Sequence, residues 1–179
     1  VATASAQPLL VWGGLVLSTS LIIWLLITNT PKGEGGGLWH LLWILMSLIG
    51  GIYQYYFNRS WSVPDTIVSR TIGYMWGVFG ISVFVLWAIN ICAITFGGIS
   101  VRQIIPMTPT IILFMGLSVA VTGLMMNRLF ISIIGAVACA ICAYFSLVNQ
   151  GVNELLCIAV TAVFTLIVPG LYLKFSNGR

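Results

Sequence analysis

Six long apolar runs dominate this 179-residue chain, and each is separated from the next by a short polar or glycine-containing link. A helix that crosses the hydrocarbon core of a bilayer needs about 20 mostly apolar residues. A membrane-spanning β-barrel would instead alternate polar and apolar residues. The pattern therefore predicts an all-α membrane protein, with residues 1–179 forming one transmembrane domain built as a six-helix bundle. The predicted spans are residues 8–28, 38–57, 66–96, 108–126, 129–148 and 153–175.

The charge content excludes most other classes of protein. Charged residues make up 6% of the chain, seven basic and three acidic, whereas a soluble domain carries about 25%. So few charges cannot cover a water-facing surface, which excludes a soluble enzyme, a disordered tail, a coiled coil and a nucleic-acid binder. We therefore predict a non-enzymatic protein without cofactor, metal site or catalytic residues, whose first partner is the lipid bilayer.

Basic residues in the links predict the orientation, because Lys and Arg concentrate on the cytoplasmic side of a membrane. With six spans, both termini share one side with the second and fourth links. That side carries Arg59, Arg70, Arg128, Lys174 and Arg179, together with Asp65. The other side carries Lys32, Arg102, Glu34 and Glu154. The basic excess on the first side predicts that both termini are cytoplasmic.

Polar residues at the starts of three runs predict helix caps, because their side chains can accept hydrogen bonds from unpaired backbone N–H groups. Asp65 is the expected cap of the third helix, and Asn153 of the sixth. Thr108 is the expected cap of the fourth, with Pro109 in its first turn, where a missing N–H costs nothing.

Three sets of small residues recur at helical spacing, which places each set on one face of its helix. Small residues allow two helix backbones to approach closely in a membrane. We predict that these sets pack helices together within the chain, and dimerisation is the alternative. The sets are Gly73, Gly77 and Gly80; Gly116 and Ala120; and Gly135, Cys139 and Ala143.

Hydroxyl side chains inside the runs raise a second hypothesis, a narrow path for a small neutral or lipidic solute. The alternative is that each hydroxyl bonds to its own helix or to a neighbouring one. The candidate residues are Ser18, Ser20, Thr122, Thr161 and Thr165.

Cys139 and Cys142 form a Cys-x-x-Cys pair, which raises a third hypothesis, a membrane thiol oxidoreductase. A reactive thiol needs an accessible, electropositive site to ionise. The neighbours of this pair are apolar, so the composition favours a role as small core residues.

The even-numbered runs end alike, with Gly-Ile-Tyr at residues 51–53, Gly-Leu at 123–124 and Gly-Leu-Tyr at 170–172. Asn and Arg follow each of them within a few residues. The chain is thus a candidate for three repeated helical hairpins. The alternative is that the membrane interface selects these residues independently.

Three segments resemble a set of uncharacterised six-span membrane proteins of Bacteroidota. They are PLLVWG at residues 8–13, LWHLLW at 38–43 and SRTIGYMWG at 69–77. The resemblance implies the same topology and a bacterial inner membrane. It implies no activity and no site residues.

Packing motifs are plentiful in this chain and reactive groups are few. This balance favours a small sensor or accessory module that acts through a partner protein or as a homo-oligomer.

Overall fold

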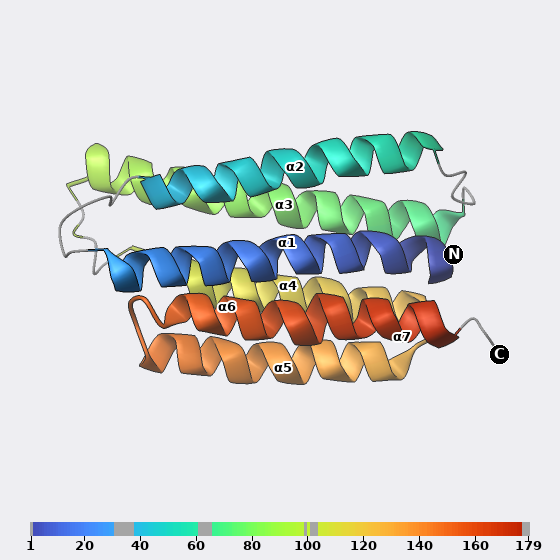
Figure 1. The fold of residues 1–179 in the computed structure, drawn as a ribbon. Helices are drawn as coiled ribbons and strands as arrows, with labels where there is room; N and C mark the ends of the chain where they lie inside the picture. Colours follow the sequence, from blue (N-terminus) through green and yellow to red (C-terminus); the bar gives the residue numbers. More distant parts are fainter. Residues whose placement is uncertain (1, 31–37, 61–65, 99, 101–103, 177–179) are drawn as a thin grey trace.

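The computed structural model describes residues 2–30, 38–60, 66–98, 100 and 104–176, and almost all of these residues are helical. Helices that are joined by a link run in opposite directions along one bundle, whereas α6 and α7 continue in the same direction as one rod (Figure 1). Five helical rods are long and apolar enough to cross a membrane, and α2 contributes a shorter apolar stretch, Leu41–Tyr56. The prediction of an all-helical chain with several helices of spanning character is therefore confirmed. The elements are α1 (Ala2–Asn29), α2 (Leu38–Ser60), α3 (Ile67–Thr95), α4 (Met107–Met125), α5 (Leu129–Val148), α6 (Glu154–Ala162), η1 (Val163–Ile167) and α7 (Val168–Ser176).

The helix starts differ from the sequence predictions in their details. Helix α1 already begins at Ala2, because the alanine-rich segment before Pro8 has high helix propensity and continues the helix past the proline. The Thr66 hydroxyl caps α3 by accepting a hydrogen bond from the Ser69 N–H at 3.1 Å. The predicted cap of that helix, Asp65, lies outside the described residues.

The other two predicted caps do not act through their side chains. Helix α4 begins at Met107 with Pro106 at the N-cap position, so Thr108 already lies inside the helix. Asn153 occupies the N-cap of α6 but makes no side-chain cap hydrogen bond. There the Glu154 carboxylate accepts a hydrogen bond from the Gly151 N–H at 2.9 Å and closes the turn instead.

The core lies between α1, α4, α5 and the rod formed by α6, η1 and α7. One cluster of buried side chains joins these elements toward the end of the bundle where α1 begins, and a second joins α4, α5 and α6. Helices α2 and α3 lie at the periphery, where α2 packs against α1 and α3 against α4. The first cluster contains Ala6, Leu9, Met115, Val119, Ile131, Leu166 and Leu173, and the second contains Ile112, Cys139, Cys142, Ala143 and Ile158.

The last rod contains a π-helical turn, η1, immediately before a proline. The Val168 N–H donates to the carbonyl of Val163, five residues back. Pro169 has no N–H to pair with the carbonyl four residues before it, so the helix widens ahead of the proline. Gly13 of α1 packs against this turn, where an added Cβ would lie 2.8 Å from Ile167 Cγ1. The glycine therefore allows α1 to approach the widened turn closely.

The charged side chains divide between the two ends of the bundle. Helix α1 begins and α7 ends at the same end (Figure 1). Arg70 near the start of α3, Arg128 between α4 and α5, and Lys174 near the end of α7 lie there too. We call this the cationic end. Glu154 lies at the opposite end, at the start of α6. Lys32, Glu34, Arg102, Arg179 and the side chain of Arg59 lie outside the described residues.

Candidate functional site

Helices α4 and α5 approach each other most closely through small residues. A Cβ added to Gly116 would overlap the Cys139 side chain and lie 3.1 Å from the Gly135 carbonyl oxygen. A Cβ added to Gly135 would lie 2.9 Å from Val119 Cγ1. Ala143 is also buried on the packed face of α5. Two of the three sets of small residues therefore lie at contacts within the chain.

A hydrogen bond between side chain and backbone extends this contact toward the cationic end. The Ser132 hydroxyl of α5 donates to the carbonyl of Ala120 in α4 at 2.6 Å. A Cβ on Gly123 would lie 2.6 Å from the Ser132 backbone nitrogen, so the two backbones nearly touch there. The tight turn that follows allows this approach, and in it Asn127 takes a positive φ of 54°.

The third set of small residues, Gly73, Gly77 and Gly80 of α3, has different surroundings. A Cβ added to any of these three glycines would meet no atom of the described chain within 4 Å. Gly73 and Gly77 are exposed, and Gly80 is partly exposed. We call this surface the α3 glycine face. It has the spacing of a helix-packing surface, but no other part of the described chain packs on it.

Two polar side chains hold α3 against α4 and the segment before it. The Trp76 indole N–H donates to the Thr122 hydroxyl at 3.3 Å. The Asn90 side-chain amide donates to the Ile105 carbonyl at 2.9 Å, and Asn90 is buried. The Trp76 and Phe79 rings also meet edge to face, with their centroids 5.7 Å apart. These contacts fix the rotation of α3 about its axis, and at that rotation Gly73 and Gly77 are exposed.

The hydroxyl groups of the candidate polar path donate hydrogen bonds to nearby backbone carbonyls. Ser18 is exposed and donates to the Leu15 carbonyl of its own helix. Ser20 and Thr161 are fully buried, and each donates to a carbonyl four residues earlier, at 2.7 and 2.6 Å. Thr122 and Thr165 make the same type of bond. In this arrangement each hydroxyl donates its proton to the backbone of its own helix.

The thiols divide into a buried group and one exposed residue. Cys139 and Cys142 are buried in the cluster between α4, α5 and α6, and Cys157 packs against the same cluster. Cys92 is exposed on α3. All four are free thiols, and no group of three or more metal-ligating side chains occurs in the described part of the chain. Cys139 fills the space above Gly116, so its position has a packing explanation.

A shallow, open pocket of about 460 Å³ lies along one face of α2. Two of its lining residues, Tyr55 and Tyr56, have rings that meet edge to face with centroids 5.7 Å apart. It is lined by Ser47, Leu48, Gly51, Ile52, Tyr55 and Tyr56.

Two features of this arrangement could not be predicted from the residues alone. The hydrogen bond from Trp76 to Thr122 joins two helices whose relative rotation the sequence does not reveal. The open surroundings of the α3 glycine face depend on the same rotation. Comparison with protein-family models, curated proteins and solved structures finds no match to this chain.

Proposed function

We propose that this chain is a non-enzymatic, multi-pass membrane protein that acts by associating with another transmembrane helix through the α3 glycine face. The observation that carries the proposal is the open space above Gly73, Gly77 and Gly80. In the same chain, neighbouring atoms occupy the space above a similar set of small residues where α4 meets α5. The partner is either a second copy of the chain or a different membrane protein, as expected of a sensor or accessory module.

Lipid acyl chains are as apolar as the helices, so the hydrophobic effect does not drive two apolar helices together in a bilayer. Helix association in lipid therefore depends on close van der Waals packing, which small residues at four-residue spacing permit. Few of the side chains of α3 are buried within the chain, namely Ile72, Leu86 and Asn90. The exposed surface around Gly73 and Gly77 is available to a partner.

We further propose that α2 also crosses the bilayer, which gives six spans with both termini in the cytoplasm of a bacterial inner membrane. The placement of Arg70, Arg128 and Lys174 at one end supports this orientation, because basic residues favour the cytoplasmic side. Helix α1 packs against α2, α3 against α4 and α5 against α6, which is compatible with a repeat of three hairpins.

The test is to replace glycine by leucine on the α3 face and to measure complex size in native membranes by cross-linking and native electrophoresis. We expect the wild-type chain to migrate as a complex larger than the monomer, and Gly73→Leu/Gly77→Leu to reduce that complex at least tenfold. The double variant should still fold, because a Cβ at either position meets no atom of the described chain.

The matched control is Gly14→Leu, which also adds a side chain in open space but on α1. We expect this control to retain the complex. A wild-type chain that migrates as a monomer, or equal losses in the control and the α3 variant, would contradict the proposal.

A further inference from the structure

We propose that α2 is a movable wall of the bundle that closes on α3 and covers the α3 glycine face, so that closure and partner binding compete for one surface. The consequence for a partner rests on the proposed function, because closure regulates access to the same face. The closure itself is a property of the single chain and can be measured without a partner.

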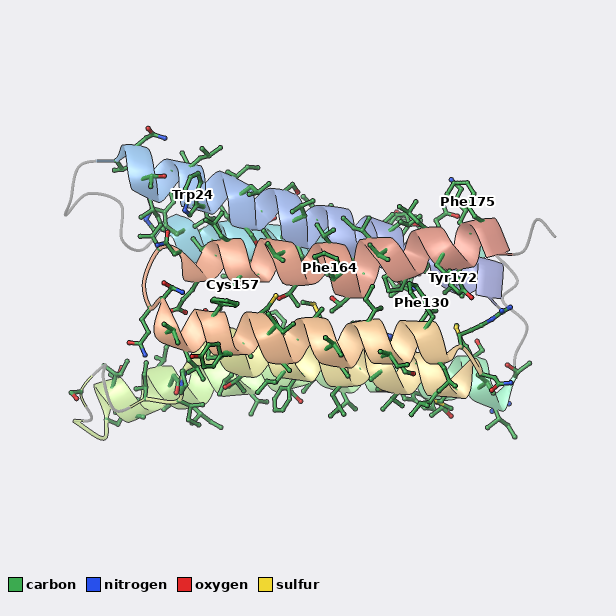
Figure 2. The ribbon with its side chains drawn as sticks, turned by 90° about the horizontal axis from the view of Figure 1, so that it is seen from below. Trp24, Phe130, Cys157, Phe164, Tyr172 and Phe175 are labelled. Carbon is green, nitrogen blue, oxygen red and sulfur yellow. The ribbon has the colours of Figure 1, made fainter. Side chains whose placement is uncertain are left out.

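Helices α2 and α3 follow each other in the chain but are not a packed pair in its described part. Packing runs from α2 to α1, from α1 to the rod formed by α6, η1 and α7, and from that rod through α5 and α4 to α3. The helices therefore form an arc. Its two ends, α2 and α3, lie on the same side of the bundle in Figure 1, and Figure 2 separates the α1 side of the arc from the α4 side.

One face of α2 is packed on α1, and the neighbouring face is open. Gly50 lies against Trp12 of α1, where an added Cβ would overlap the indole ring. Gly51 follows by one residue, which turns its position by about 100° around the helix. A Cβ added to Gly51 would meet no atom within 4 Å, and the pocket of about 460 Å³ is lined by Gly51 and Ser47 on this open face.

Helix α3 has the same arrangement. Trp76 is bonded to Thr122 of α4, and Gly77, one residue later, is exposed. Because α2 and α3 run in opposite directions, the one-residue step turns their open faces in opposite senses around the bundle (Figure 1). With α1 and α4 placed as in Figures 1 and 2, both faces turn toward the space between α2 and α3.

The open faces also lie at the same depth. Gly51 is nine residues before the last residue of α2, and Gly77 is ten residues after the first residue of α3. At about 1.5 Å per residue, both glycines lie about 15 Å from the same end of the bundle. Small residues at matching depth allow two membrane helices to pack closely. Helices α4 and α5 pack in this way at Gly116 and Cys139.

Helix α2 is held from one side. Its packing partner is α1, and Met46 and Gly50 are its buried residues among the described side chains. A rotation of α2 about the contact between Gly50 and Trp12 brings Gly51 toward α3. A partner on the α3 glycine face binds the open arrangement alone, so it shifts the population away from the closed one.

The test is disulfide trapping of Gly51→Cys/Gly77→Cys in the full chain, in lipid vesicles at low protein density, with copper phenanthroline as the oxidant. Two cysteines join when their Cα atoms come within about 7 Å, so a link requires α2 and α3 to close. The variant should fold, because a Cβ at either position meets no atom of the described chain. Peptide mass spectrometry identifies the link, and gel mobility shows that it lies within one chain.

The matched control is Gly51→Cys/Val78→Cys, since Val78 is 62% exposed and turned about 100° further around α3. We expect at least ten times more link in the Gly77 variant. Equal yields, or no link in either variant, would overturn the closure.

A second measurement tests the competition with a partner. We expect the cross-linked chain to form at least tenfold less α3-dependent complex than the same variant after reduction, and equal amounts would overturn the competition. Efficient trapping in a chain that forms no complex would contradict the proposed function and leave the closure standing. An α3-dependent complex without trapping would contradict the closure and leave the proposed function standing.

Discussion

Gly116 is one of three glycines, with Gly123 and Gly135, that allow the close approach of α4 and α5. Gly116 lies where the Cys139 side chain crosses, and an added methyl group would overlap it. We expect Gly116→Ala to destabilise the protein by about 1–3 kcal/mol, because overpacking a close contact forces side chains and backbone apart. The measurement is thermal or denaturant unfolding in a mild detergent.

The matched control for this residue is Gly14→Ala on α1, where a Cβ meets no atom within 4 Å. This change removes a helical glycine without a clash, so we expect it to be neutral or to stabilise by up to about 1 kcal/mol. The compensating change Cys139→Gly, made together with Gly116→Ala, is expected to recover part of the loss. Similar stability of Gly116→Ala and Gly14→Ala would show that the α4–α5 distance is not limiting.

At the scale of elements, hydrogen bonds at two positions along α3 hold this helix to its neighbours. One is the bond from Trp76 to Thr122, and the other is the bond from Asn90 to the Ile105 carbonyl. We expect Thr122→Val and Asn90→Leu each to destabilise the protein by about 0.6 kcal/mol and by no more than about 2 kcal/mol, the range for polar contacts between membrane helices. Trp76 and Asn90 lie about 20 Å apart along the helix, so the two effects should add.

Hydrogen exchange distinguishes this loosening of α3 from a general loss of stability. In both variants we expect faster exchange of backbone amides in α3 than in the wild type, with smaller changes in α5. Exchange that accelerates equally in both helices would mean that α3 does not loosen as a separate unit.

At the scale of the whole molecule, the alternating helices place Arg128 and the end of α7 together and the α5–α6 link at the far end (Figure 1). We therefore expect a membrane-impermeant thiol reagent to reach Arg128→Cys and a C-terminal tag from the same side. Gln150→Cys, in the exposed α5–α6 link, should react from the opposite side only. Labelling above the wild-type level is the measurement, and labelling of Arg128→Cys and Gln150→Cys from one side would refute the alternation.

Also at this scale, the lengths of most helices could be predicted from the sequence, but the direction in which each face points could not. The fifth run, residues 129–148, coincides with α5, and most other ends agree within about three residues. A bilayer fixes these lengths because apolar residues must cover its core. Lipid and protein core are both apolar, however, so apolar patterning does not distinguish a lipid-facing side from a buried one. Gly77 and Gly116 therefore look alike in the sequence, although only Gly116 is covered.

The close approach of Gly13 to the turn before Pro169 also has a consequence for biogenesis. Helix α1 is synthesised before its main packing partners, α6, η1 and α7. Until α6 has been made, the nascent α1 has only α2 as a close neighbour. A chain that stops before α6 therefore leaves α1 without most of the surface that buries it in the folded protein.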